Sequence, residues 1–251
     1  MNSKKNTLFN PAAQIQNMAD KHFIDVEKDE KVAAIHHEAS SDKWIFFCHG
    51  FGTDKEGSYE MRCEKAAEEG WNAVRFDFRG NGESDGDFID QTLTSKIKDL
   101  KMAINHFEPE EYVLYGMSFG GRVAIHTAVE LEPEALVLKS PVTYNEIMEK
   151  FKAVVEEKGE YTHFGDKTID HRFIEDLEEN RFEETVSDID IPVCFFHGRS
   201  DTTVHPEFTL KAVQEFGTDT RVEMYEGEKH KMSREANRKL LDSMFQWLEN
   251  F

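Results

Sequence analysis

Short runs of apolar residues alternate along the chain with longer segments in which apolar residues recur every three or four positions. The first pattern is typical of buried strands, and the second is typical of helices that cover a sheet. Their alternation predicts an α/β fold with a mostly parallel central sheet and helices on both faces. The expected strands are residues 31–37, 43–49, 72–78, 111–115, 135–139, 192–197 and 220–225. The expected helix faces are Ile97, Leu100, Ile104 and Phe107, and Leu240, Leu241, Met244, Phe245 and Leu248.

Residues 141–190 interrupt this alternation, because the segment is too long for a simple connection between neighbouring strands. It contains an amphipathic helical pattern at 147–155, a hairpin pattern around Gly165 and Asp166, and an acidic helical pattern at 173–179. We interpret 141–190 as an inserted cap over the open end of the sheet, with residues 1–140 and 191–251 forming the core domain. The alternative is an extended helical crossover without a role in binding.

The chain of 251 residues carries a formal net charge of −20, and 32% of its residues are charged. Proteins that bind nucleic acids concentrate Lys and Arg on one face, so this acidity argues against a nucleic-acid partner. The hydrophobic fraction of 39% is still sufficient for one large folded domain. The acidity fits a role in solubility and leaves the habitat undetermined.

The sequence contains no run of about 18 apolar residues that could span a membrane. No apolar stretch follows the two N-terminal lysines, so we expect no secretory signal, no membrane partner and a cytoplasmic location. Cys48 and Cys194 lie inside apolar strand patterns, and with Cys63 they make an odd number of cysteines. We therefore expect reduced, buried, structural thiols.

The stretch from Gly116 to Gly121 reads GMSFGG and directly follows the strand pattern at 111–115. Strand, Gly-x-Ser-x-Gly and helix in this order form the nucleophile elbow of a serine hydrolase, which would make Ser118 the nucleophile. The alternative is that Ser118 only caps the following helix, because a serine at a helix start often accepts a hydrogen bond from a backbone N–H of the first turn. The choice depends on whether the chain supplies an acid and a base.

Two later strand patterns are followed by such groups. Asp201 comes shortly after 192–197, and His230 comes shortly after 220–225. The chain order Ser118, Asp201, His230 matches the order of nucleophile, acid and histidine in α/β-hydrolases. Asp201 could instead be an ordinary turn residue, and the rival histidines are His197, at the end of its strand, and His205, before a helix-starting proline.

The sequence His49-Gly50-Phe51-Gly52 follows the strand pattern at 43–49. We expect this loop to aim the N–H of Phe51 at a bound carbonyl oxygen, while the N–H of Phe119 approaches from the elbow. His49 is interpreted as a structural residue that braces the loop. Asp77, at the end of the strand pattern at 72–78, is interpreted as a hydrogen-bonding loop residue and not as a second catalytic acid.

Together the motifs HGFG (49–52), FDFRGNGES (76–84), GMSFGG (116–121), HGRSDTTV (197–204) and the late His230 resemble the α/β-hydrolase superfamily over nearly the whole chain. The lysine after HGFG, the FDFRGNGESDG motif and the modest insertion after residue 141 are similar to small bacterial carboxylesterases of the feruloyl (cinnamoyl) esterase type. Two residues depart from that pattern. Met117 precedes the nucleophile where these esterases often have histidine, and Asn81 replaces the histidine of the Gly-His-Gly loop, so cinnamoyl specificity is not implied.

The resulting hypothesis is a serine hydrolase that cleaves small carboxylic esters through an acyl-enzyme. Alternatives are a thioesterase, acyltransferase or small peptidase with the same triad, or a ligand-binding or sensor protein with slow turnover. The candidate pocket residues are Met117, Tyr144, Phe151, Tyr161 and Phe164. The sequence leaves open whether the chain forms a homodimer.

No cofactor is implied by this hypothesis, and no metal is expected. His36 and His37 have no third ligand at a useful spacing. The glycines at 52 and 57 are not followed by the lysine of a phosphate-binding loop, and the glycines at 80 and 82 lack the third glycine of a dinucleotide fingerprint.

Overall fold

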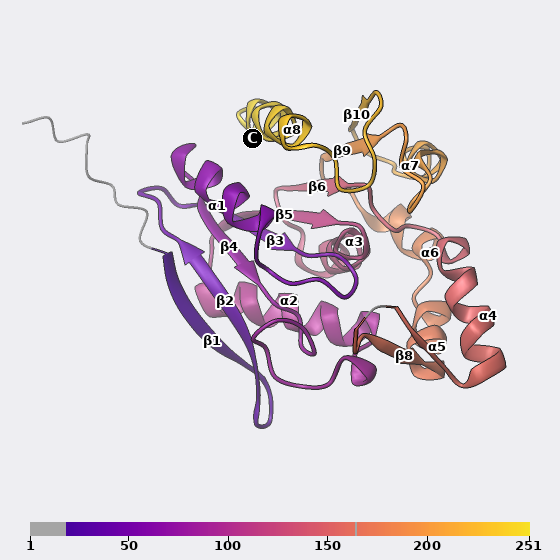
Figure 1. The fold of residues 1–251 in the computed structure, drawn as a ribbon. Coiled ribbons are helices and arrows are strands. Elements are labelled where there is room, and N and C mark those ends of the chain that lie inside the picture. The colour runs from indigo at the N-terminus through magenta and orange to yellow at the C-terminus, as the bar shows by residue number, and fades with distance from the viewer. Residues whose placement is uncertain (1–18, 164) are drawn as a thin grey trace, which may run out of the picture.

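The computed structural model describes residues 19–163 and 165–251, and its centre is an eight-stranded sheet (Figure 1). The strand order is β1-β2-β4-β3-β5-β6-β9-β10. β2 is antiparallel to both β1 and β4, and the six strands β4-β3-β5-β6-β9-β10 are parallel to one another. The strands are β1 (Ala19–Glu27), β2 (Glu30–His37), β3 (Lys43–Cys48), β4 (Asn72–Phe76), β5 (Glu111–Met117), β6 (Ala135–Lys139), β9 (Val193–Gly198) and β10 (Thr220–Tyr225).

All seven expected strands are present, and the expected α/β-hydrolase fold is confirmed. The central strands β4, β6 and β9 are buried along their whole length, which explains why they read as continuous apolar runs. β1 was not expected from the sequence. Its residues are mostly polar or exposed, and only Ile24 and Val26 are buried, as suits an antiparallel strand at the edge of a sheet.

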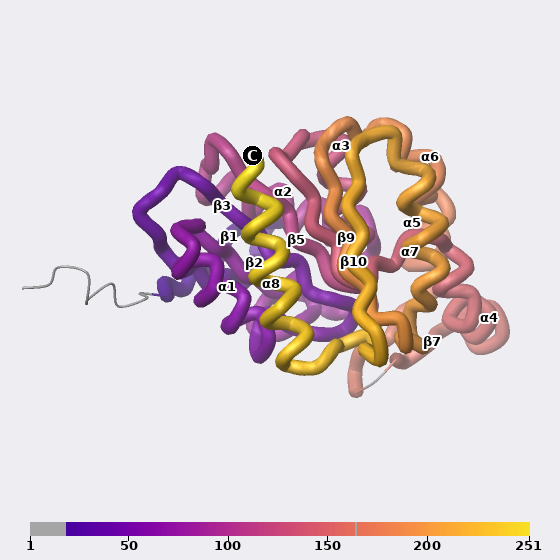
Figure 2. Tube along the Cα trace, turned by 90° about the horizontal axis from the view of Figure 1, so that it is seen from above, coloured from indigo at the N-terminus to yellow at the C-terminus, as the bar shows by residue number. Residues whose placement is uncertain are grey.

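Helices cover both faces of the sheet and form two apolar layers. α1 and α8 pack on one face, and α2 and α3 pack on the other (Figure 1). Seen from above, α8 and α1 lie in front of the strands (Figure 2). The helices of the sheet layers are α1 (Ser58–Glu68), α2 (Leu93–Phe107), α3 (Phe119–Leu131), α7 (Pro206–Ala212) and α8 (Arg234–Leu248), with the short 3-10 turn η1 (Phe88–Asp90) before α2.

The segment between β6 and β9 adds helices and a small hairpin on the side toward which β5 and β6 point (Figure 1). Its hairpin pairs β7 with β8 around the expected turn at Gly165 and Asp166. α5 lies against α2, and β8 lies against η1. The elements of this segment are η2 (Asn145–Met148), α4 (Glu149–Lys158), β7 (Glu160–Thr162), β8 (Thr168–Asp170), α5 (His171–Glu179), α6 (Phe182–Thr185) and η3 (Val186–Asp188).

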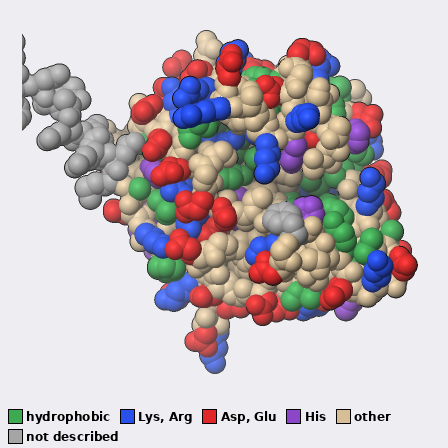
Figure 3. Space-filling model, viewed as in Figure 1, with side chains coloured by type: hydrophobic (Ala, Val, Ile, Leu, Met, Phe, Trp, Pro, Cys, Tyr) green, Lys and Arg blue, Asp and Glu red, His purple; other side chains and the backbone are tan. Residues whose placement is uncertain are grey.

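Acidic side chains are spread over the visible face, with Lys and Arg placed among them (Figure 3). The face shown therefore does not present the continuous basic patch that is typical of proteins that bind nucleic acid. Within residues 19–163 and 165–251, no helix is long and apolar enough to cross a membrane.

Candidate active site

Ser118 lies at the turn between β5 and α3, in a backbone conformation that few side chains adopt. Its φ is 55° and its ψ is −121°, which places a non-glycine residue in a strained region. The turn is tight, because a Cβ atom at Gly116 would lie 2.5 Å from the carbonyl oxygen of Gly120. A Cβ atom at Gly120 would lie 2.3 Å from the carbonyl oxygen of Cys48. The two glycines therefore allow the close approach that the elbow motif predicts.

The side chain of Ser118 makes no capping hydrogen bond to α3. The ordinary alternative, a serine that caps the following helix, is therefore not what the structure shows. The backbone of Ser118 holds the turn instead. Its N–H donates to the carbonyl of Lys139 (3.0 Å), and its carbonyl accepts from the N–H of Val142 (2.9 Å).

The structure brings Asp201 and His230 together at the carboxyl ends of β9 and β10. Nδ1 of His230 lies 2.7 Å from Oδ2 of Asp201. A carboxylate can only accept, so Nδ1 carries the proton and Nε2 is left with a free lone pair. Asp201 is 2% exposed, whereas the His230 side chain is 16% exposed. This is the orientation that a histidine needs to act as a general base.

Asp201 is held as an anion by its surroundings. Burial alone raises the pKa of its carboxyl, but hydrogen bonds from His197 and His230 hold that pKa well below its ordinary value. Its second oxygen, Oδ1, accepts from the N–H groups of Thr203 (2.8 Å) and Val204 (3.0 Å). Asp201 is thus both a turn residue and the partner of a histidine, and the two interpretations do not conflict.

The two rival histidines lie in other places. His197 is fully buried, and its Nε2 lies 3.0 Å from the carbonyl of Val204 and 3.2 Å from Asp201. Its Nδ1 lies 2.8 Å from the hydroxyl of Thr209, so both ring nitrogens have partners inside the protein. His205 is exposed and directly precedes Pro206, where α7 begins. His197 thus supports Asp201 from below, and His230 is the ring directed away from the core.

The loop after β3 passes directly beside Ser118. A Cβ atom at Gly50 would lie 3.3 Å from Cβ and 3.8 Å from Oγ of Ser118. The next residue, Phe51, places its ring edge-to-face against the ring of Phe119, with 5.8 Å between centroids. Phe119 is the first residue of α3, where backbone N–H groups have no partner within the helix. The two residues expected to form the oxyanion hole are therefore neighbours on either side of the serine.

His49 and Asp77 hold this loop from beneath. The Nδ1–H of His49 donates to the carbonyl of Gly50 (2.9 Å), and its Nε2 accepts from the N–H of Phe78 (3.0 Å). Burial lowers the pKa of His49 to about 4, so the ring stays neutral and keeps both bonds. Asp77 accepts from the backbone N–H (2.7 Å) and the side-chain amine (2.7 Å) of Lys55. Both residues serve the loop, as the sequence predicts.

A cluster of aromatic rings lies over Phe51. Phe151 stacks on Phe51 at 6.0 Å, and Tyr161 stacks on Phe151 at 4.4 Å. Phe88 and Phe173 contact Phe51 edge-to-face at 5.1 and 5.6 Å. Phe88 comes from η1, and the other three rings come from α4, β7 and α5, so the segment between β6 and β9 contributes three of the four rings around Phe51.

Two of the other candidate pocket residues, Tyr144 and Met117, are not in this cluster. Tyr144 is fully buried and packs against Phe182 and Phe208 instead. Met117 packs with the apolar layer on the α1 and α8 side of the sheet. Phe164 lies outside the described residues. The sequence does not predict Phe88 and Phe173 as pocket residues, although both are aromatic residues that a search for pocket walls could have included.

Arg122 ties α3 to both ends of the segment that carries these rings. Its guanidinium donates to the carbonyl of Thr143 and to Oδ1 of Asn145 (3.0 Å) at one end. It donates to the carbonyl of Asn180 (2.6 Å) at the other end. Because Arg122 follows Ser118 by four residues on α3, the aromatic cluster and the serine are fixed to the same helix.

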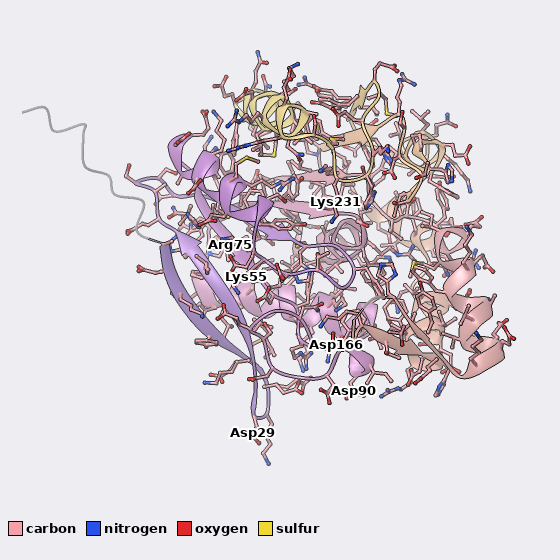
Figure 4. The ribbon with its side chains drawn as sticks, viewed as in Figure 1. Asp29, Lys55, Arg75, Asp90, Asp166 and Lys231 are labelled. Carbon is pink, nitrogen blue, oxygen red and sulfur yellow. The ribbon has the colours of Figure 1, made fainter. Side chains whose placement is uncertain are left out.

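Three further polar residues near the site were not expected as site residues. Lys55 lies beside Arg75, whose guanidinium donates to the carbonyl of Lys55 (2.9 Å; Figure 4). Lys139 and Asn237 are buried beneath the loop that carries His230. The sequence singles out only the lysine after HGFG, as part of a motif. The burial of all three residues depends on contacts between distant parts of the chain.

In the described part of the chain, no group of three or more His, Cys, Asp or Glu side chains could hold a metal ion. His36 stacks on Trp44 at 4.8 Å, and its Nε2 lies 3.0 Å from Oδ1 of Asn72. A hollow of about 440 Å³ lies at the opposite edge of the sheet, beside Pro133 and Pro192 before β6 and β9. It includes none of the residues that surround Ser118.

Comparisons with known proteins agree with the fold. Residues 39–163 match the model of the family described as serine aminopeptidase, S33. The mitochondrial palmitoyl-protein thioesterase ABHD10 of Pongo abelii is 25% identical over 213 residues, which cover 78% of this chain and 70% of the relative.

Two solved structures share the fold. The mouse α/β-hydrolase domain-containing protein 10 superimposes with a TM-score of 0.82 at 20% identity, covering 92% of this chain and 99% of that chain. Est1E from Butyrivibrio proteoclasticus with bound ferulic acid superimposes with a TM-score of 0.79 at 18% identity, covering 91% and 98%. At these identities the likeness concerns the fold.

Proposed function

We propose that this chain, which has the α/β-hydrolase fold, is a serine hydrolase that cleaves carboxylic esters through Ser118, His230 and Asp201. The observation that carries the proposal is the 2.7 Å contact between Nδ1 of His230 and the buried carboxylate of Asp201. Ser118, the proposed nucleophile, has the strained backbone of an elbow. In the proposed mechanism this pair supplies the base, and Ser118 supplies the nucleophile.

In this mechanism His230 takes the proton of Ser118 through Nε2 as the serine oxygen attacks the carbonyl carbon. Asp201 keeps the imidazole in the required tautomer and stabilises its positive charge. The N–H groups of Phe51 and Phe119 donate to the oxyanion, and removal of one such donor typically costs about 10²–10³ in rate. His230 then protonates the leaving group, and water hydrolyses the acyl-enzyme with the same base.

The aromatic cluster favours an apolar or planar acyl group. Phe51, Phe151 and Tyr161 offer stacked faces beside the serine, contributed partly by the segment we interpret as a cap. Aromatic rings bury large apolar areas and stack on planar groups. Est1E, which shares the fold, is known with bound ferulic acid. We therefore propose a preference for aromatic or medium-chain acyl esters over acetate.

A thioester substrate is the second candidate. The observation that favours it is the similarity to the palmitoyl-protein thioesterase ABHD10, which covers 78% of this chain. The same triad attacks esters and thioesters by the same steps, so the choice depends on the acyl pocket and the leaving group.

The test is hydrolysis of p-nitrophenyl acetate, butyrate and octanoate, methyl ferulate and palmitoyl-CoA by the wild type and by Ser118→Ala. We expect kcat of the preferred substrate to fall by roughly 10⁶ in the variant. Ser140→Ala is the matched control, because Ser140 also has a positive φ (44°) and follows the adjacent strand β6. Activity that survives in Ser118→Ala would refute the proposed nucleophile.

A further inference from the structure

Lys139, the last residue of β6, connects the two halves of the candidate site. Its carbonyl accepts the N–H of Ser118 (3.0 Å). Its side chain runs the other way and donates from Nζ to the carbonyl of Lys231 (2.9 Å), the residue after His230. Figure 4 labels Lys231 on the loop between β10 and α8. One fully buried residue thus contacts both the turn of the nucleophile and the loop of the histidine.

Asn237 of α8 completes this arrangement. Its Oδ1 accepts from Nζ of Lys139 (3.0 Å) and from the guanidinium of Arg62 (2.8 Å). Its Nδ2 donates to the carbonyls of Lys231 (3.0 Å) and Ser233 (2.8 Å). The carbonyl of Lys231 therefore receives two side-chain hydrogen bonds from beneath, one from a strand and one from a helix.

The surroundings of Lys139 do not pair it with an acid. The charged groups that act on its amine are Arg62 from α1, Asp201 after β9 and Glu228 on the loop of His230. Among the hydrogen bonds of the described residues, its amine contacts only the carbonyl of Lys231 and the amide of Asn237. Burial, assisted by Arg62, lowers the pKa of Lys139 to about 6. A neutral amine has two N–H donors, which match the two acceptors present.

The loop that carries His230 needs such support. Met232 has a positive φ of 56°, which is strained for a non-glycine residue. Asp201 fixes the imidazole only at Nδ1, and the opposite nitrogen must reach the serine oxygen. The backbone at Lys231 sets the height of the ring above the sheet. A displacement of about 1 Å in such a centre can cost about 10²-fold in rate.

We propose that Lys139 is a positioning residue that holds the backbone after His230 and thereby sets the imidazole against Ser118. This inference rests on the proposed function, in which His230 is the base. The alternative is that Lys139 only fills space beneath the loop. A methionine would fill the same space without donating a hydrogen bond, so the two roles can be separated.

The experiment compares Lys139→Met with the wild type, using the ester that the wild type hydrolyses best. We expect kcat to fall about tenfold to a hundredfold with little change in KM, while the thermal midpoint does not fall. Lys239→Met is the matched control, because Lys239 is exposed on α8 and pairs with the exposed Glu235. It should retain wild-type kcat. A role limited to packing would leave kcat of Lys139→Met unchanged or reduce it only in proportion to folded protein.

A second readout does not depend on turnover. The proton between His230 and Asp201 gives a downfield resonance in the NMR spectrum of the resting protein. We expect this resonance to shift or broaden in Lys139→Met and to stay in place in Lys239→Met. An unchanged resonance together with wild-type kcat would overturn the proposal.

Asn237→Ala removes the same support from the side of α8 and keeps the test open if Lys139→Met folds poorly. Both residues act on the carbonyl of Lys231, so the double variant should be no slower than the slower single variant. Multiplied losses would show that the two act independently and would contradict the proposal. Ser118→Ala and His230→Ala separate a failure of the proposed function from a failure of the proposed role of Lys139. Their retained activity would refute the proposed function, whereas their inactivity beside a fully active Lys139→Met would refute only the role of Lys139.

Discussion

Lys55 and Lys139 are both almost completely buried, and each supports one loop of the candidate site, yet their surroundings are opposite. Nζ of Lys55 lies 2.7 Å from both Asp77 and Glu83. Burial by itself lowers the pKa of Lys55, but the hydrogen bonds and the negative charge of the two acids raise it above its ordinary value. Lys139 has carbonyl and amide partners instead, and its pKa falls to about 6.

The difference shows that the contacts of a buried lysine decide its charge. The oxyanion loop is held by an ionic cluster, in which the loss of one member leaves a buried charge uncompensated. The histidine loop is held by neutral hydrogen bonds, whose donor would be more stable in water as a cation. The first arrangement should stabilise the fold as it supports the loop. The second should support the loop at a cost to stability.

The largest expected effect is a loss of kcat in a variant of the proposed triad, which both loops support. Asp201→Asn keeps the size of the side chain but allows the imidazole to turn its proton toward Ser118. We expect kcat to fall by about 10⁴, with the fold retained. Steady-state kinetics and circular dichroism check this result. A loss of less than tenfold would mean that the two loops do not converge on this acid, and the comparison would lose its functional meaning.

Lys55→Met tests the ionic side. It leaves the carboxylate of Asp77 fully buried without its cation, which should destabilise the protein by about 3–5 kcal/mol. Urea unfolding at neutral pH measures this loss, and turnover should fall as the loop loosens. Lys98→Met is the control, because Lys98 and Glu27 form an exposed pair. Equal, small effects of the two variants would show that burial does not strengthen the pairing of Lys55.

Lys139→Met tests the neutral side through pH. The pKa of Lys139 is about 6 in the folded chain and about 10.5 when unfolded, so between these values unfolding takes up a proton. The stability due to this group is complete above about pH 10.5 and falls as the pH falls toward 6. The methionine variant has no group that titrates in this way. The difference in free energy of unfolding, variant minus wild type, should therefore rise by at most about 1.4 kcal/mol for each pH unit of acidification.

Urea unfolding of both proteins at about pH 9 and about pH 7 measures that difference, since the other titrating groups largely cancel between them. A constant difference across this range would mean that Lys139 stays charged in the folded protein. Lys55→Met should show no such pH dependence near neutrality, because Lys55 is charged in both states.

The parts of the molecule that the sequence predicts are those with a local signature. β6 and β10 have the expected bounds. β6 is a buried, mostly apolar run, whereas β10 is a half-buried edge strand that alternates polar and apolar residues. Ser118, Asp201 and His230 were selected because each follows a strand at the edge where parallel strands end. The placement of His230 against Asp201 in the structure agrees with that selection.

The remaining parts depend on contacts that no local pattern encodes. β1 is an edge strand with one face exposed to solvent, so its many polar residues do not form the apolar run by which a buried strand is predicted. Lys139 looks like the polar end of a strand, and its burial becomes visible only when Asn237, 98 residues later, lies above it. Tyr144 is predicted to line the pocket because it is an aromatic residue of the segment 141–190, but its partners Phe182 and Phe208 belong to another cluster.

The smallest expected effect is at the rim of the ionic cluster. Glu83→Gln removes the outer partner of Lys55, yet the Glu83 side chain is half-exposed and also pairs with exposed Lys21. Surface charge interactions are weak and screened by salt. We therefore expect a slight fall in the thermal midpoint that vanishes as ionic strength rises from about 0.01 to about 1 M, with turnover unchanged. If Glu83→Gln lost as much stability as Lys55→Met, the oxyanion loop would be stabilised mainly by the exposed pair with Glu83. The two lysines would then differ in the exposure of their partners and not in the type of partner.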